Sequence, residues 1–160
     1  MKAKTVEESR IIMAQTMMPQ DANPYGSVHG GAIMKLIDNA AAVCAIRHCR
    51  KNAVTASIDR LDFKTPVFVG ELVTLKAGVN MVGRTSMEIG VRVESENIRT
   101  GDCRHAASAY LTFVCLGDKG QPLEVPPLAL ETEEEVRRNR EAQSRRKTRL
   151  AEKKREQTID

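Results

Sequence analysis

The sequence predicts an α+β fold in which an antiparallel β-sheet curls around one long, mostly buried helix. Residues 30–47 carry apolar side chains at helical spacing, and residues 73–81 and 87–93 alternate between apolar and polar. Glycine or proline turns separate the other apolar runs. One helix can cover only one face of such a sheet, so the sheet is expected to wrap around it. The edge strands that remain invite pairing with a second copy of the chain.

The N-terminal part is expected to form a strand, a loop and the helix. Residues 9–18 form the strand, and a loop rich in turn-forming residues, bounded by Pro19 and Pro24, follows. The apolar stripe of the helix 30–47 nearly encircles it, which is typical of a helix buried on most sides. Three of its few polar residues lie along one seam: Lys35, Asp38 and Asn39.

Residues 53–116 are expected to form four antiparallel strands. The first of them changes its alternation phase near residues 59–60, which predicts a β-bulge there. The two alternating segments form a hairpin with one buried face. The last strand, 104–116, is apolar on both faces in its second half, so it is expected to lie in the centre of the sheet.

Residues 131–160 form a charged tail, in contrast to residues 1–130, which are expected to form the folded domain. Thr132 and Glu135 make a capping box, and acidic residues followed by basic ones suit a helix dipole. Because so few residues here are apolar, we expect a solvated, partly frayed helix with no apolar seam to bury. An arm that binds RNA or an anionic surface is the functional alternative.

The composition argues against several classes of protein. The chain has no Trp, two Tyr and three Phe, too few aromatic side chains for a nucleic-acid stacking surface, so nucleic acid is not an expected partner. The four cysteines form no CxxC pair, which argues against a zinc site or a disulfide framework and favours a reducing compartment. No apolar run approaches the ~20 residues of a membrane span, and no signal peptide is expected. The expected location is the cytoplasm.

The helix is expected to begin at His29, Gly30 and Gly31. Free N–H groups at a helix N-terminus point outward along a positive dipole, and glycines let another group approach closely. Such a helix start can serve as an oxyanion or anion pocket. The alternative is that the two glycines only permit a sharp turn.

Asp38 and Asn23 each allow two interpretations. A carboxylate in a mostly apolar helix is costly unless it is paired or useful. Asp38 is therefore either a general base or nucleophile facing a cleft, or a bland residue that is exposed on the Lys35–Asn39 seam or paired with Lys35. Asn23 precedes a proline and is either a turn residue or a group that orients a water molecule.

The turn at residues 83–86 is a candidate phosphate site, because a glycine followed by a cation and two hydroxyls can hold a phosphate. Hairpin turns without a ligand often have the same composition. Arg60, Lys64 and Arg104 can add positive charge to such a site. His48 and His105 are interpreted as structural, and no Ser–His–Asp set or metal cluster stands out. The residues of the turn are Gly83, Arg84, Thr85 and Ser86.

Four segments together resemble the hotdog-fold acyl-CoA thioesterases, and most closely the cytosolic brain-type acyl-CoA hydrolases and their bacterial single-domain relatives. The resemblance covers roughly residues 8–130, and the motifs keep the order and spacing of the family. The segments are NPYGSVHGGAIMKLIDNAA, VTASIDRLDFKTPVFVGE, VGRTSMEIGVRVESEN and AYLTFVCLGDKGQPLEVPP.

This resemblance implies a hotdog fold and the hydrolysis of acyl-CoA to a fatty acid and coenzyme A, as part of fatty acid metabolism. It implies dimers that assemble as a trimer of dimers, a homohexamer, with active sites between subunits. No metal or organic cofactor is implied, because coenzyme A enters as part of the substrate.

The resemblance also implies roles for particular residues. Asp38 resembles the catalytic carboxylate, and Asn23 resembles a loop asparagine that faces Asp38 of the partner subunit. The Gly31 amide resembles the group that polarises the thioester carbonyl, and His29 belongs to the same motif. The residues that resemble a coenzyme A phosphate site are Gly83, Arg84, Thr85 and Ser86, with Arg60 and Lys64.

Three alternatives stay open at this point. Asp38 either activates water or attacks the thioester directly. A hotdog-fold dehydratase acting on a 3-hydroxyacyl thioester would pair a histidine with a carboxylate, and His29 and Asp38 supply those types. A non-catalytic regulator that only binds acyl-CoA is the third.

Overall fold

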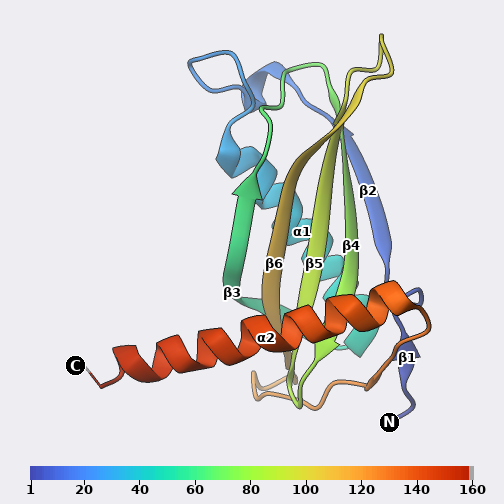
Figure 1. The fold of residues 1–160 in the computed structure, drawn as a ribbon, viewed down its shortest axis with the longest axis vertical. Helices are drawn as coiled ribbons and strands as arrows, with labels where there is room; N and C mark the ends of the chain where they lie inside the picture. The colour runs from blue at the N-terminus through green and yellow to red at the C-terminus, as the bar shows by residue number, and fades with distance from the viewer. Residues whose placement is uncertain (159–160) are drawn as a thin grey trace.

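The computed structural model describes residues 1–158 and confirms the predicted α+β fold (Figure 1). A five-stranded antiparallel sheet with the strand order β2-β4-β5-β6-β3 packs against one long helix, α1, and β1 and β7 form a separate two-stranded parallel sheet. The elements are β1 (Lys4–Thr5), β2 (Ile11–Thr16), the 3-10 helix η1 (Pro19–Asp21), α1 (Gly30–Cys49), β3 (Asn52–Phe63), β4 (Leu72–Val82), β5 (Ser86–Glu96), β6 (Cys103–Leu116), β7 (Leu128–Ala129) and α2 (Glu133–Glu156).

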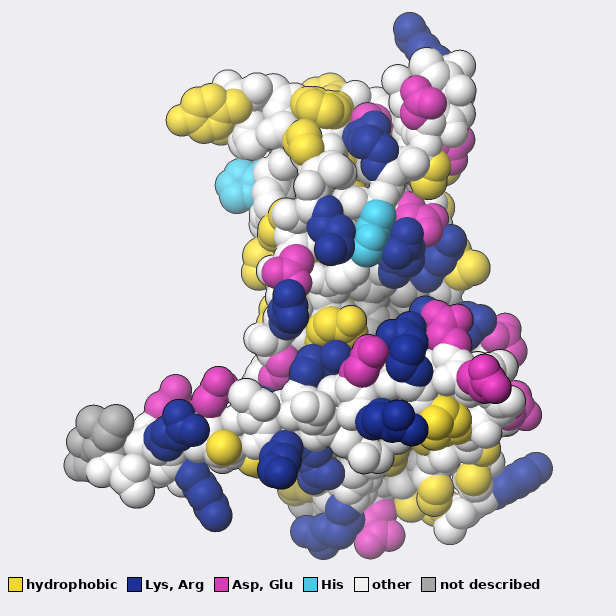
Figure 2. All heavy atoms as spheres, viewed as in Figure 1, with side chains coloured by type: hydrophobic (Ala, Val, Ile, Leu, Met, Phe, Trp, Pro, Cys, Tyr) yellow, Lys and Arg dark blue, Asp and Glu magenta, His cyan; other side chains and the backbone are white. Residues whose placement is uncertain are grey.

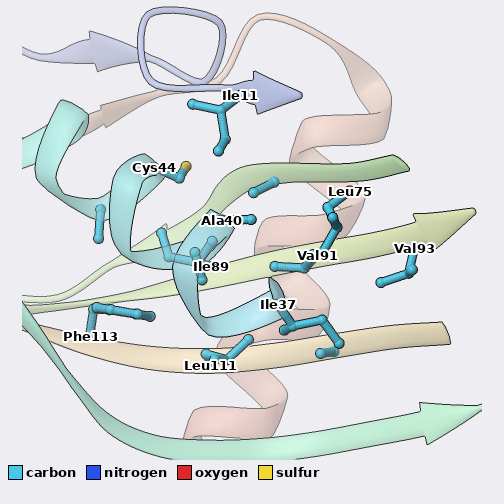
Figure 3. Close-up of a cluster of buried hydrophobic side chains, with 14 of the residues drawn as sticks. Ile11, Ile37, Ala40, Cys44, Leu75, Ile89, Val91, Val93, Leu111 and Phe113 are labelled. Carbon is cyan, nitrogen blue, oxygen red and sulfur yellow. The ribbon is translucent and has the colours of Figure 1, made fainter. Parts of the chain in front are cut away.

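The core lies between α1 and the concave face of the sheet. Ile37 of α1 lies toward Val91 of β5 and Leu111 of β6, and Phe113 of β6 belongs to the same buried cluster, as Figure 3 shows. Burying each such side chain contributes about 1.5–3 kcal/mol to the free energy of unfolding. Small residues on the buried side of α1 let the helix approach the sheet closely: Ala40, Ala41, Cys44 and Ala45.

Strand β3 is an edge strand and carries two irregularities in its pairing with β6. The register shifts between Thr55 and Ser57 and again between Ile58 and Arg60. The second shift confirms the bulge predicted near residues 59–60, whereas the first was not predicted. Strand β6 has a partner on each side, so its predicted central position is also confirmed.

The helix α2 crosses the face of the sheet opposite to α1 (Figure 1). The capping box of Thr132 and Glu135 is present, with the Glu135 amide donating to Thr132 Oγ1 at 3.1 Å. The expectation of a solvated helix with nothing to bury is wrong, because Ala142 is completely buried and Asn139 donates to the carbonyl of Asn80 at 2.9 Å. The last two residues of the tail, 159–160, lie outside the described residues.

The physical reason for this error is the polarity of the sheet face that α2 covers. That face carries acidic and hydroxyl groups, which bind α2 through arginines rather than through an apolar seam. Arg145 forms a salt bridge with Glu88 of β5 at 2.7 Å and its guanidinium lies 3.7 Å from the centroid of the Tyr110 ring. In Figure 2, acidic and basic side chains intermingle along the helix.

His48, near the C-terminal end of α1, is fully buried and structural in its contacts, as the sequence predicted. Its Nδ1 lies 3.3 Å from the Ser9 hydroxyl and its Nε2 lies 2.9 Å from the carbonyl of Pro126. Burial lowers the pKa of the imidazole below its usual value. The side chain therefore joins α1 to segments before and after the sheet.

None of the helices among residues 1–158 has the length and apolarity needed to span a membrane.

Candidate active site

Asp38 is the ninth residue of α1, in its third turn. Its side chain is half-buried and contacts the edge strand β3. The Thr55 hydroxyl donates a hydrogen bond to Asp38 Oδ1 at 2.6 Å. Within residues 1–158, Asp38 forms no salt bridge with Lys35. Thr55 was missed, because regular alternation along the strand assigns it to the face away from the helix.

The start of α1 is capped by His29, whose Nδ1 accepts a hydrogen bond from the Gly31 amide at 3.0 Å. The carbonyl of His29 accepts from the amides of Ala32 and Ile33. The imidazole of His29 is exposed to solvent. The Gly31 amide, which was predicted to polarise a carbonyl, therefore has a partner in the single chain. Because the His29 ring is exposed, a ligand oxygen can replace its Nδ1 as the acceptor.

Asn23 organises the loop that precedes α1. Its side-chain Oδ1 accepts from the amides of Tyr25 at 2.9 Å and Ser27 at 3.3 Å, and its Nδ2 donates to the Ser27 hydroxyl at 2.9 Å. The loop is joined to the segment before β4, because the Val28 amide donates to the carbonyl of Val67 at 2.7 Å. Asn23 is therefore a turn residue in the single chain, and it is held in a defined orientation.

A buried ionic cluster supports the segment before β4, and sequence reasoning missed it. Glu71 accepts hydrogen bonds from the Ser95 hydroxyl, from the Phe68 amide at 3.2 Å and from Arg104 at 2.9 Å. Burial acts to raise the pKa of the Glu71 carboxyl, but the bonds from Ser95 and Arg104 outweigh it and the pKa lies below its usual value. Arg104 is thus a structural partner of Glu71. Its position in the sequence alone does not reveal this partner.

A cavity of about 330 Å³ opens beside the start of α1. Within residues 1–158, the Thr65 hydroxyl is a buried side-chain group without a hydrogen-bond partner, and Thr65 lines this cavity. A buried polar group of this kind is normally satisfied, so a ligand that accepts or donates a hydrogen bond suits the cavity. Its lining residues are Val28, Gly30, Ile33, Phe63, Lys64, Thr65, Pro66 and Val67.

The residues predicted to bind phosphate do not form one cluster in a single chain. Lys64 lines the cavity at the start of α1, whereas the turn 83–86 joins β4 to β5 at the opposite end of the sheet (Figure 1). Arg60 forms a salt bridge with Asp62 at 2.6 Å. A Cβ atom at Gly83 would lie 3.2 Å from the guanidinium of Arg146, so α2 brings a further cation to this turn.

Within the described part of the chain, no group of three or more His, Cys, Asp and Glu side chains is arranged to hold a metal ion. Cys44, Cys49 and Cys115 are buried free thiols, and Cys103 is an exposed one.

Comparison with known proteins identifies relatives over most of the chain. Residues 25–101 match the thioesterase superfamily. The VdlD protein of Helicobacter pylori is 39% identical over 145 residues, which cover 91% of this chain and 83% of that protein. The uncharacterised acyl-CoA thioester hydrolase YkhA of Bacillus subtilis is 41% identical over 81% of this chain and 76% of its own. The cytosolic acyl coenzyme A thioester hydrolase of Rattus norvegicus is 38% identical over 88% of this chain but only 38% of its own.

Solved structures agree with these relatives. An apo-hexameric acyl-CoA thioesterase superposes with a TM-score of 0.92 and 38% identity, over 95% of this chain and 97% of that one. The acyl-CoA hydrolase of Staphylococcus aureus was solved with butyryl coenzyme A, coenzyme A and coenzyme A disulfide. It superposes with a TM-score of 0.90 and 34% identity, over 98% of this chain and 96% of that one. Variants of it in which one aspartate, one asparagine or one threonine is replaced by alanine have also been solved. The chain belongs to the hotdog-fold acyl-CoA thioesterases.

Proposed function

We propose that this enzyme hydrolyses acyl-CoA thioesters at a site in which Asp38 is the catalytic carboxylate. The observation that carries this proposal is the half-buried Asp38 side chain, which the Thr55 hydroxyl holds at 2.6 Å on a helix that starts with His-Gly-Gly. A carboxylate with one oxygen held by a hydroxyl keeps its other oxygen for chemistry.

The relatives support the choice of residues. The three positions replaced by alanine in the S. aureus hydrolase are separated along that chain by the same numbers of residues as Asn23, Asp38 and Thr55 are here. They also have the same residue types. We therefore add Thr55 to the proposed site.

The chemistry follows from these groups. The thioester carbonyl oxygen takes the hydrogen bond of the Gly31 amide in place of the His29 ring, and the positive end of the α1 dipole stabilises the developing oxyanion. In one route Asp38 accepts a proton from water while the water oxygen bonds to the carbonyl carbon. In the other, Asp38 attacks that carbon and water then hydrolyses the resulting anhydride. In both routes the C–S bond breaks, and coenzyme A leaves as a thiolate that takes up a proton.

We propose that the active site is completed by a second copy of the chain. Strand β3 is an unpaired edge, and apolar side chains on it and on α1 are exposed. Antiparallel pairing of two β3 edges would place the turn 83–86 of one subunit near the α1 start of the other, so the phosphate-binding residues of one chain would lie beside Asn23 and Gly31 of its partner. The exposed apolar residues are Met34, Val43 and Ile46 on α1 and Val54, Ile58 and Phe63 on β3.

A trimer of such dimers, a homohexamer, is the proposed assembly, and the hexameric acyl-CoA thioesterase structure supports it. Asn23 would then face Asp38 of the partner subunit and orient the attacking water. We propose that the enzyme works without a metal or organic cofactor, in the cytoplasm, on substrates of fatty acid metabolism. The name of the rat relative supports the location.

The experiment that tests the function is the release of free thiol from acyl-CoAs of increasing chain length. Steady turnover on at least one chain length is expected. Tight binding of acyl-CoA without thiol release would favour a regulator instead, and loss of water from a 3-hydroxyacyl-CoA would favour a dehydratase.

The phosphate site gives a sharper prediction. Replacing Arg84 with methionine is expected to raise the KM for acyl-CoA about tenfold, because a charged hydrogen bond to phosphate contributes about 1.5–3 kcal/mol. The KM for the matching acyl-pantetheine, which has no nucleotide phosphates, is expected to stay unchanged. Steady-state kinetics on both substrates check this, with Arg140→Met, at an exposed position of α2, as the matched control.

Equal KM values for acyl-CoA in the native enzyme and the Arg84 variant would remove the turn 83–86 from the proposed site.

A further inference from the structure

Arg149 of α2 binds the carboxylate of Asp59 on the edge strand β3. Arg149 Nη1 donates to Asp59 Oδ2 at 2.6 Å and to the Thr112 hydroxyl oxygen at 2.5 Å. Asp59 also accepts from the Ser57 hydroxyl at 2.7 Å and from the Thr112 hydroxyl at 2.7 Å. The Asp59 side chain is only 8% exposed. Arg149 is the cationic partner of this carboxylate and links β3, β6 and α2 in one network.

Asp59 is the unpaired residue at the second register shift of β3, and Ser57, which donates to it, is the first residue paired after the first shift. Residues paired across antiparallel strands point to the same face, so each pairing reveals where a β3 side chain points. Thr55 pairs with Phe113, which lies in the core on the α1 side, and Ser57 pairs with Thr112, which binds Arg149 on the α2 side. Thr55 and Ser57 would share a face in a regular strand. The first shift therefore turns Thr55 toward α1 and leaves Ser57 facing α2.

This reversal brings the Thr55 hydroxyl to Asp38. Without the extra residue in β3, Thr55 would point to the face that α2 covers, away from the proposed catalytic carboxylate. Bulges are local distortions of a ladder and need contacts that favour them over the regular register. Ser57 and Asp59 are the residues after the first shift, and Thr112 and Arg149 hold them.

We propose that Arg149 is a positioning residue for catalysis: by holding Asp59, it keeps β3 in the bulged register that presents Thr55 to Asp38. The inference rests on the proposed function of Asp38. It gives the charged C-terminal helix a role in the active site, although α2 lies on the opposite face of the sheet.

The test is steady-state kinetics on an acyl-CoA with the full-length enzyme and the variant Arg149→Met. The expected result is a fall in kcat of roughly tenfold to a hundredfold, because a displacement of ~1 Å in a catalytic group can cost about 10²-fold. KM is expected to stay unchanged, since the substrate contacts remain. The control is Arg137→Met on the same helix, because the salt bridges of Arg137 within residues 1–158 are with Glu134 and Glu141 of α2 itself. Arg149→Lys is expected to recover most of kcat, since a single nitrogen makes both bonds in the native enzyme.

A second variant distinguishes positioning from general stability. Thr55→Val removes the hydroxyl, so adding Arg149→Met to it is expected to lower kcat no further if Arg149 acts through Thr55. Independent, multiplicative losses would overturn the proposal, as would a kcat for Arg149→Met equal to that of Arg137→Met. If Arg149→Met does not fold, Asp59→Asn tests the same contact from β3, with the same expected fall and the same contradicting result. Absence of turnover in the native enzyme would instead refute the proposed function itself.

Discussion

Replacing Asp38 with asparagine is expected to lower kcat for acyl-CoA hydrolysis by about 10³-fold, within the range of general acid–base catalysis. The amide has nearly the same shape and can still accept the hydrogen bond that Thr55 donates at 2.6 Å. It cannot accept a proton from water or form an anhydride, so both proposed routes lose their central group. Thiol release under saturating substrate measures the effect.

The control for this loss is Asp118→Asn, which makes the same chemical change in an exposed turn after β6. Its kcat is expected to equal that of the native enzyme. A native kcat in Asp38→Asn, with circular dichroism unchanged, would mean that Asp38 is only a helix residue bonded to its neighbouring strand.

Replacing Arg145 with methionine is expected to destabilise the protein by about 3 kcal/mol, at the lower end of the cost of breaking a buried ion pair. Glu88 is 1% exposed and accepts two hydrogen bonds from Arg145. Among the described residues, the variant would leave this buried carboxylate with one remaining donor, Asn80 at 3.0 Å. Burial disfavours the charged guanidinium, but its bonds to Glu88 outweigh this and raise the pKa of Arg145.

The double variant Arg145→Met with Glu88→Gln is expected to recover most of that stability, because the neutral amide costs far less to bury than an unpaired carboxylate. Urea unfolding at a fixed protein concentration measures both variants, with Arg137→Met as the exposed control. A single variant as stable as Arg137→Met would contradict a structural role for α2.

The buried face of the fold could be predicted because each element carries its own periodic signal. The apolar residues of α1 nearly encircle it, and the alternation of β4 and β5 defines their buried face. The phase change near Asp59 marked the second bulge of β3. The first bulge left no such signal, because Val54, Ala56 and Ile58 continue the alternation through it.

Polar contacts between distant segments could not be predicted in the same way. Pairs such as Arg149 with Asp59 and Arg104 with Glu71 join residues far apart in the sequence, and charged residues carry no periodicity that identifies a partner. For this reason α2 was expected to be solvated, and Thr55 was not assigned to the site. Asp38 was found because a carboxylate in an apolar helix is conspicuous.

In the proposed site, Asp38 of one subunit works with Asn23 of its partner. The most direct test mixes two inactive variants, Asp38→Ala and Asn23→Ala, by dissociating and reassembling them together. Mixed dimers would hold one intact site, so about a quarter of the native turnover is expected, since about half of the dimers are mixed and each has one working site of two. Turnover no higher than that of either variant alone would contradict a site shared between subunits.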